Sequence, residues 1–213
     1  QIEIKTDFTA NLMQLCRDIE NKKQRIKKLA VEKNLTASFA AQPFLDDCGN
    51  ALQFNLSLHN ENGENLFFSD EKLLQNCINS LLGDTNFMMI FLAPESEDYQ
   101  RFSHQLNVDL FKKGKFTAPV NLSFGFDNRT CAIRIKQTRI SKRLEFRIAS
   151  ANANPYLSIA AIMIALSTKS PRNSQPIFGN AFDEKYQLEE FCRDYNNALK
   201  MLNAEENFIA KKF

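Results

Sequence analysis

The chain contains 213 residues, a length that corresponds to one large domain or two small ones. Hydrophobic residues make up 44% and charged residues 24%, so the composition is globular and excludes disorder and collagen-like repeats. The net charge of +2 does not by itself indicate a nucleic-acid partner, and no apolar run approaches the ~20 residues that span a membrane.

The five cysteines are odd in number and widely separated, and no pair has the spacing of a zinc or redox motif. They predict free thiols in a reducing cytoplasm. The chain begins with Gln1 rather than Met and has no basic, apolar leader. We therefore expect no secretory signal and interpret the sequence as a fragment, a processed form or an engineered piece of a soluble protein.

In chain order, the first elements expected are a strand, a long helix and a second strand. Alternation of apolar and charged residues indicates a strand at 1–8. Thr9 is expected to cap a helix that extends to about Lys33, because apolar residues recur there at three- and four-residue steps. Residues 35–41, shortly before Pro43, indicate the next strand.

The clearest strand of the sequence is predicted at residues 52–59. Apolar residues occupy one face, and the other face carries polar side chains that either face water or form the wall of a ligand cleft. Asn62-Gly63 predicts a turn with positive φ that returns the chain through residues 66–68. The polar face of this strand comprises Gln53, Asn55, Ser57 and His59.

After this turn the sequence predicts a helix, a buried segment and a loop. The helix is expected from Glu71 to Leu82, where Gly83 would end it. Residues 87–92 form an apolar segment that we expect to be buried. The polar, mixed pattern of residues 99–115 indicates a long functional loop.

Two more strands and two more helices are predicted in the second half. The strands are expected at 129–135 and 143–148. Pro155 stands at the first position of a helix through Leu166, and a last amphipathic helix is predicted at about 183–202. No linker or internal repeat divides the chain, so these elements together predict one α+β domain.

The predicted strand at 143–148 places ionised side chains in a row. Arg143, Glu145 and Arg147 share one face, each about 6–7 Å from the next. Arg129 and Arg134 lie just upstream, so these four arginines belong to one stretch of nineteen residues, which also contains Arg139. Guanidinium groups bind phosphate and carboxylate through paired hydrogen bonds, which indicates an anionic ligand, although a surface salt-bridge ladder fits the same pattern. Glu145 is either the counter-ion of these arginines or a ligand for a hard cation such as Mg²⁺ or Mn²⁺.

Several blocks of the chain, in the order in which they occur, resemble motifs of the glutamine synthetase family. Residues 118–135 resemble the segment that carries the family's phosphate-binding arginines. Residues 142–147 and 151–157 resemble its Arg-x-Glu-x-Arg strand and the start of the helix that follows. The other matching blocks are residues 1–4, 36–44, 49–58 and 63–68.

The resemblance implies the α+β catalytic domain of that family, with a curved antiparallel β-sheet backed by helices. It would occupy residues 1–213, without the family's N-terminal β-grasp domain and first metal-ligand strand. The reaction implied is phosphorylation of the γ-carboxylate of glutamate by ATP, followed by attack of ammonium or another amine on the acyl phosphate, with Mg²⁺ or Mn²⁺ present. Carried over position by position, the implied site residues are Arg129, Arg134 and Arg143 for the phosphates, Gly49, Arg101 and Arg147 for glutamate, Phe8, Asn55 and Ser57 for the nucleotide, and Glu3, Gln53 and Glu145 for metals.

Three positions depart from the family pattern. Gln53 and Asn55 stand where the family has histidines, and Thr117 stands where it has the glutamate that takes a proton from ammonium. A threonine cannot act as that base at neutral pH. In addition, the stretch 102–115 is inserted before the arginine block.

Two functions therefore remain open at this point. The first is a glutamine synthetase-like ligase, either a glutamate–ammonia ligase or a γ-glutamyl–amine ligase. The second is a catalytically silent homologue that binds an anionic metabolite or partner through the arginines. Both predict small-molecule ligands, no nucleic acid and no membrane, and the family's ring assemblies make a homo-oligomer compatible with either.

Overall fold

The fold is built on a four-stranded sheet with the strand order β1-β4-β3-β2. This computed structural model describes residues 2–204. β1 and β3 each pair antiparallel with the central β4, whereas β2 pairs parallel with β3. The strands are β1 (Phe54–Leu56), β2 (Phe124–Phe126), β3 (Ile133–Gln137) and β4 (Lys142–Phe146).

The expected α+β class is confirmed, but the sheet is mixed rather than wholly antiparallel. The difference arises after β2, where Asp127 adopts a left-handed backbone conformation with φ of 46°. The loop that follows returns the chain so that Phe124 lies opposite Ile133 and both strands point the same way. An antiparallel hairpin at this place is therefore excluded, and the end of β2 lies beside the polar face of β3.

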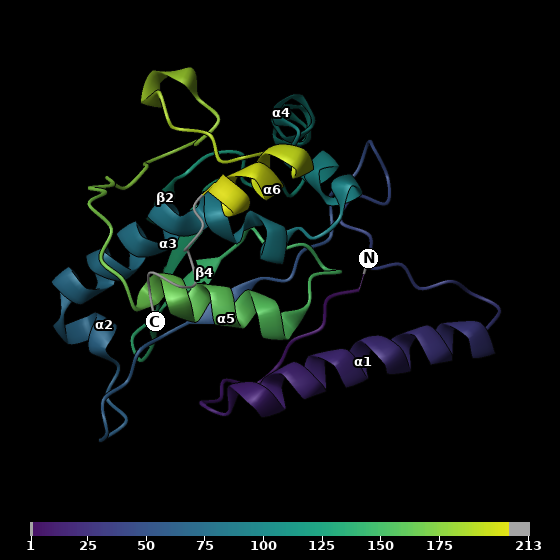
Figure 1. Ribbon diagram of the computed structural model, residues 1–213, viewed down its shortest axis with the longest axis horizontal. Helices are drawn as coiled ribbons and strands as arrows, with labels where there is room; N and C mark the ends of the chain where they lie inside the picture. The colour runs from purple at the N-terminus through teal and green to yellow at the C-terminus, as the bar shows by residue number, and fades with distance from the viewer. Residues whose placement is uncertain (1, 205–213) are drawn as a thin grey trace.

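Helices cover the apolar face of the sheet (Figure 1). α3 (Glu71–Leu92) packs against α5 (Pro155–Leu166) and α6 (Tyr195–Ala204). Asp70 caps α3 by accepting a hydrogen bond from the Leu73 backbone N–H at 2.8 Å. The fully buried core side chains include members of the sheet and of these helices, such as Leu81, Met88, Ile133, Leu144 and Phe146.

α3 continues through Gly83, so the helix end expected there is wrong. A Cβ atom at Gly83 would collide with the side chain of Ser170. The missing side chain therefore lets the segment after α5 pack closely against the middle of α3. The apolar segment expected at 87–92 is buried as predicted, as the last part of the same helix.

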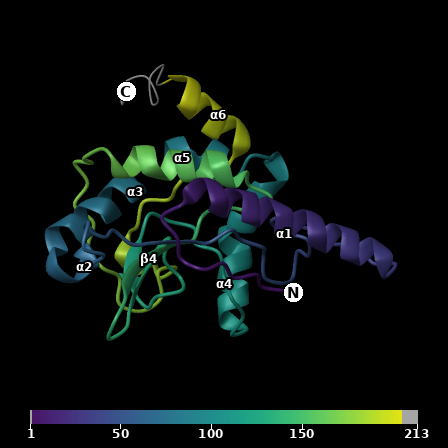
Figure 2. The same cartoon turned by 90° about the horizontal axis from the view of Figure 1, so that it is seen from below.

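α1 (Leu12–Glu32) lies along α5, and its C-terminal half extends beyond the rest of the fold (Figure 2). Its cap is Asn11, whose Oδ1 accepts a hydrogen bond from the Gln14 N–H at 3.0 Å. The expected cap, Thr9, instead accepts a hydrogen bond from the backbone N–H of Asn11. Only Cys16 of α1 is buried, which fits a helix that contacts the body over a short length.

Several expected elements take another form. Residues 2–8 and 35–41 are not strands, because neither run pairs with a described strand; Gln1 lies outside the described residues. Residues 66–68 belong to the short helix α2 (Leu66–Ser69), which Asn65 caps by accepting from the Phe67 N–H. The positive φ of Gly63 in the preceding turn is confirmed, at 79°.

The long loop expected at 99–115 is largely helical. It contains the 3₁₀ helix η1 (Ser96–Phe102) and α4 (His104–Lys112), and Ser103 caps α4 by accepting from the Leu106 N–H at 3.4 Å. The last expected helix, at 183–202, is interrupted. The 3₁₀ helix η2 (Glu184–Tyr186) precedes an extended stretch before α6, because Gln187 adopts a left-handed conformation that ends the first turn.

No helix among residues 2–204 combines the length and the apolar character needed to cross a bilayer. All five cysteines are free thiols, and three of them are buried.

Candidate active site

The polar face of the sheet brings three of the expected residues into one row. Asn55 of β1 lies opposite Glu145 of β4, and Glu145 lies opposite Arg134 of β3. Opposed residues in antiparallel strands share a face, so these side chains are neighbours. Arg143 lies on the same face, and its Nε donates a hydrogen bond to Asn55 Oδ1 at 2.9 Å. The sheet register therefore assembles the two polar strands that the sequence singled out.

Glu145 lies between two guanidinium groups. Its Oε2 accepts from Arg134 Nη1 at 3.1 Å, and its Oε1 accepts from Arg147 Nη1 at 2.7 Å. The side chains of Glu145, Arg134 and Arg147 are 7%, 7% and 4% exposed. Asp127 supplies a second carboxylate, which accepts from Arg134 Nε at 2.9 Å and is largely exposed. This arrangement is a buried ion-pair cluster, hereafter the arginine cluster, made of Arg134, Glu145 and Arg147.

Arg147 carries a donor that no described residue satisfies. Its Nη2 donates to the carbonyl oxygen of Thr117 at 3.1 Å, but its buried Nε has no hydrogen-bond partner among residues 2–204. Burial lowers the pKa of Arg147, and the nearby charges of Arg134 and Arg129 lower it further, against the opposing effect of Glu145. An anion that accepted a hydrogen bond from Nε would satisfy the donor and offset this repulsion.

Arg101 points its guanidinium at the backbone, not at the polar face. Its Nη1 donates to the Ile148 carbonyl at 2.6 Å, and its Nη2 donates to the Arg147 carbonyl at 2.8 Å. Burial lowers the pKa of Arg101 to about 9, with a further contribution from the charge of Arg147. Gly49 lies against the same side chain, since a Cβ there would be 2.9 Å from Arg101 Cγ and 2.7 Å from the Ala41 oxygen. Arg101 thus fixes the backbone at Arg147 and Ile148, and Gly49 leaves room for the Arg101 side chain.

Two other expected arginines are accessible. Arg129 is exposed, lies over the ring of Phe116 at 5.0 Å, and forms no ion pair with a residue in the described range. Arg143 is half-buried and lies over the ring of Phe8 at 5.7 Å. Both guanidinium groups can therefore contact a ligand without first breaking a buried interaction.

The residues expected to hold a metal do not form a site. Glu3 is exposed and lies 3.9 Å from Lys5, Gln53 is exposed, and both carboxylate oxygens of Glu145 are bound by arginines. Within residues 2–204, no group of three or more His, Cys, Asp or Glu side chains is arranged to hold a metal ion. The donors present do not fit a divalent cation.

Ser57, expected near the nucleotide, contacts a histidine. Its Oγ lies 3.1 Å from His59 Nε2, while His59 Nδ1 lies 2.9 Å from the Gly63 carbonyl oxygen. Ser57 and Asn55 stay on the same edge of the sheet as Arg143, as their alternation predicts.

The sequence reasoning missed Asp127 and Phe116. Asp127 belongs to an Asp-Asn pair, which is a turn signal that could have placed a carboxylate next to β3. Phe116 gave no signal, because its contact with Arg129 depends on a loop between α4 and β2 whose path the sequence does not define.

Comparison with known proteins gives consistent matches. A family model described as the catalytic domain of glutamine synthetase matches residues 1–213. Gamma-glutamylputrescine synthetase PuuA of Escherichia coli (strain K12) is 31% identical over 171 residues, which cover 78% of this chain and 34% of the relative. Type-1 glutamine synthetase 2 of Dictyostelium discoideum is 30% identical over 201 residues, covering 88% of this chain and 36% of the relative.

A solved structure described as a GmaS/ADP complex has the same fold. It matches with a TM-score of 0.78 at 24% identity and covers 95% of this chain and 48% of that chain. The chain spans roughly a third of the length of the two curated relatives described above, at 34% and 36%.

Proposed function

The chain belongs to the glutamine synthetase family, and on that premise we propose that it is the catalytic-domain core of an ATP-dependent carbon–nitrogen ligase. In this proposal ATP phosphorylates the γ-carboxylate of glutamate, and an amine displaces phosphate from the resulting acyl phosphate. The names of the relatives, glutamine synthetase and gamma-glutamylputrescine synthetase, support a ligase of this kind. The ADP in the description of the structural neighbour supports a nucleotide as the phosphoryl donor.

The observation that carries the proposal is the buried, unpartnered Nε of Arg147 beside the accessible Arg129 and Arg143. Transfer of a phosphoryl group between two anions requires concentrated positive charge at the reacting centre. Here the arginine cluster holds two guanidinium groups against one buried carboxylate, and two further guanidinium groups lie at its edge. The surface is therefore suited to bind two anions side by side.

Each arginine has a distinct role in this proposal. Arg147 binds the carboxylate of glutamate through its free donor, and Arg129 and Arg143 bind phosphate oxygens. Arg134 stays bound to Glu145 and Asp127, and so contributes charge and fixes Glu145. Arg101 is a positioning residue, because its guanidinium is bound to the backbone that follows β4.

In this proposal the nucleotide binds along β1 and the N-terminal segment. Phe8 is exposed with Arg143 over its ring, so a base or ribose at this edge would contact both an aromatic face and a guanidinium. Asn55 and Ser57 complete this edge. Gly49, expected beside glutamate, packs against Arg101 instead.

A catalytically silent homologue is the second candidate, and specific contacts favour it. Both oxygens of Glu145 are taken by arginines, and the donors at Glu3 and Gln53 are exposed and dispersed. Thr117 offers no carboxylate near the arginine cluster, and its carbonyl oxygen already accepts from Arg147. In this alternative the same arginines bind an anionic metabolite without ligation.

Phosphate release separates the two candidates. The full chain is supplied with ATP, glutamate, an amine and Mg²⁺ or Mn²⁺, and inorganic phosphate is measured. Arg129→Ala should lower the rate constant kcat/KM for phosphate release by about 10²–10³-fold, because it removes one donor to the developing charge. Its unfolding midpoint should not change, since Arg129 is exposed and makes no described ion pair.

Arg17→Ala is the matched control, because Arg17 is an exposed arginine of α1. It should leave phosphate release unchanged. ADP binding that depends on Arg129 without any phosphate release would support the silent homologue. Absence of both phosphate release and ADP binding would contradict the ligase and would restrict the silent homologue to an anion other than a nucleotide.

A further inference from the structure

An open hollow of about 530 Å³ lies between α4, the end of β2 and the segment 176–180. Three phenylalanines line it: Phe111 from α4, Phe126 from β2 and Phe178 from the later segment. Their side chains are 43%, 53% and 72% exposed, although large apolar residues are usually buried. Asp127 and Arg129 also line the hollow, so it combines aromatic walls with ionised groups.

The walls of the hollow are fixed by close backbone packing. The Ile177 N–H donates to the Phe124 carbonyl at 2.8 Å, so the segment lies along the free edge of β2. Gly125 permits this approach, because a Cβ there would lie 2.7 Å from the Ile177 oxygen. Asn128 Nδ2 donates to the carbonyl oxygens of Ile177 and Gly179, which holds the segment on its other side. The aromatic side chains are thus presented on an ordered frame.

The hollow adjoins the candidate active site through two shared residues. Asp127 lines the hollow and binds Arg134 of the arginine cluster. Arg129 lines the hollow and lies over Phe116, the residue before Thr117. A molecule in the hollow would therefore reach the arginine cluster near Thr117 without crossing the sheet.

We propose that this hollow is the subsite for the acceptor, and that the acceptor is a primary amine that carries an aromatic ring. This inference rests on the proposed ligase function. Aromatic rings pack edge-to-face with other rings and stack on guanidinium groups, and the hollow offers both kinds of partner. Ammonium or methylamine would leave these three phenylalanines in water.

The charge of the site suits a neutral amine. Among the described residues that line the hollow, Asp127 is the one carboxylate, and it is already paired with Arg134. The apolar walls and the guanidinium of Arg129 therefore disfavour a second cation, so an amine held there is favoured in its unprotonated, nucleophilic form. Its nitrogen attacks the carbonyl carbon of the acyl phosphate, the C–N bond forms, and the C–O bond to phosphate breaks. The departing phosphate takes the proton of the amine. The subsite thus holds the amine in its unprotonated form, so no base is needed at the position of Thr117.

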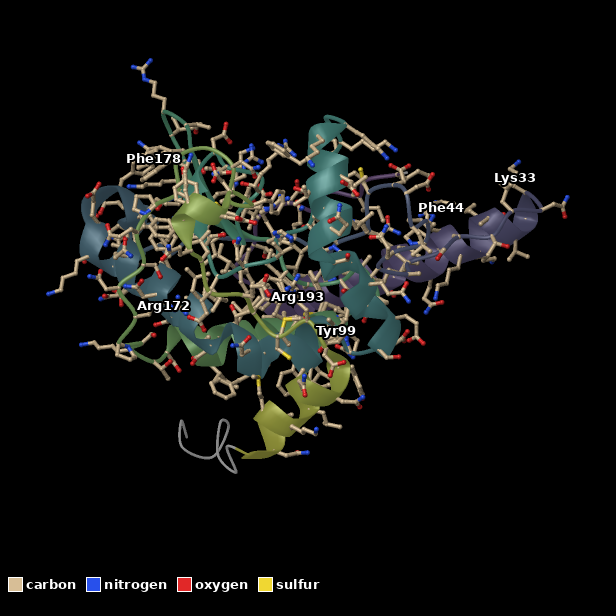
Figure 3. The ribbon with its side chains drawn as sticks, turned by 90° about the horizontal axis from the view of Figure 1, so that it is seen from above. Lys33, Phe44, Tyr99, Arg172, Phe178 and Arg193 are labelled. Carbon is tan, nitrogen blue, oxygen red and sulfur yellow. The ribbon has the colours of Figure 1, made fainter. Side chains whose placement is uncertain are left out.

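Binding of two amines that differ by a ring tests the proposal. 2-Phenylethylamine and ethylamine are titrated separately into the full chain by calorimetry. The ring-bearing amine should bind at least tenfold more tightly, and Phe178→Ala should remove most of that preference. A tenfold change corresponds to about 1.4 kcal/mol. Phe44→Ala is the matched control, because Phe44 is 65% exposed and lies far from Phe178 (Figure 3).

Equal affinity for the two amines would overturn the proposal, as would a preference that survives Phe178→Ala. Phosphate release distinguishes this failure from failure of the ligase function. Release with ammonium but without ring preference would refute the acceptor class while leaving the ligase function intact. Ring-dependent binding at Phe178 without phosphate release would support the subsite and contradict the ligase function.

Discussion

Replacing Glu145 by glutamine would test whether its carboxylate holds the arginine cluster together. The substitution keeps the shape of the side chain but removes its charge and turns one acceptor oxygen into an NH₂ donor. That donor would then face Arg134 or Arg147, both of which offer only N–H groups. The variant therefore leaves two buried guanidinium groups without the carboxylate between them.

The expected cost follows from the burial of the three side chains, none of which is more than 7% exposed. Removing one partner of a buried ion pair typically costs about 3–5 kcal/mol, because the remaining charge stays buried without compensation. Arg134 keeps its contact with Asp127, so we expect a loss of about 3 kcal/mol in the free energy of unfolding. The free energy of unfolding of a natural domain is only about 5–15 kcal/mol, so a loss of this size would be readily measured.

Urea unfolding followed by circular dichroism measures the effect. Glu3→Gln is the control, because Glu3 and Lys5 are both exposed and form a surface ion pair at 3.9 Å. It should cost under about 1 kcal/mol. The double variant Glu145→Gln with Arg147→Met should be more stable than Glu145→Gln alone, since it removes one uncompensated charge. A loss below about 1 kcal/mol for Glu145→Gln, or no recovery in the double variant, would refute the reasoning.

Three further predictions concern the same site and its support. Arg143→Ala should weaken binding of ADP in calorimetry by about 1.5–3 kcal/mol, whereas Lys112→Ala, at an exposed position of α4, should change it by under about 1 kcal/mol. Equal effects would reduce the arginine row to a surface ladder. Gly49→Ala should lower the free energy of unfolding by about 1–3 kcal/mol, because its Cβ would overlap Ala41 and Arg101; an unchanged urea midpoint would contradict that packing. Burial raises the pKa of Asp98, so the folded state binds the proton of this carboxyl more tightly than the unfolded state does. The resulting stabilisation is complete below the unfolded pKa of about 3.9 and is lost as pH rises through the folded pKa. Asp98→Asn, which can still accept from the Glu95 N–H, should lack this decline; parallel stability curves for the two proteins from pH 4 to 7 would exclude it.

The polar face of the sheet could be predicted because it depends on alternation within strands. Arg143, Glu145 and Arg147 share a face, and Asn55 lies opposite Glu145, as period-two patterning requires. The direction of Arg101 could not be predicted. Its guanidinium binds carbonyl groups 46 and 47 residues further along the chain, and no local pattern encodes a contact of that separation.

Helix ends and loops, which the sequence marks only by an interruption of the apolar pattern, are harder to predict. The sequence predicts a helix end at Gly83, yet the packing of Ser170 against α3 requires a glycine within the helix. The helix α4 was missed because its polar residues include Asn107, whose buried amide donates to the Arg101 carbonyl and whose oxygen accepts from the Ala118 N–H. A buried asparagine that joins two segments looks, in sequence, like a residue of a loop.

The contacts of Arg101 also bear on the backbone that follows β4. The carbonyl oxygens of Arg147 and Ile148 accept from its guanidinium, while the Arg147 N–H donates to the Ala132 carbonyl and the Ala149 carbonyl accepts from the Leu52 N–H. A side chain from η1 therefore braces the sheet where its regular strand ends. Because the same guanidinium fixes the backbone of Arg147, a single residue outside the sheet sets the direction of the arginine whose Nε has no described partner.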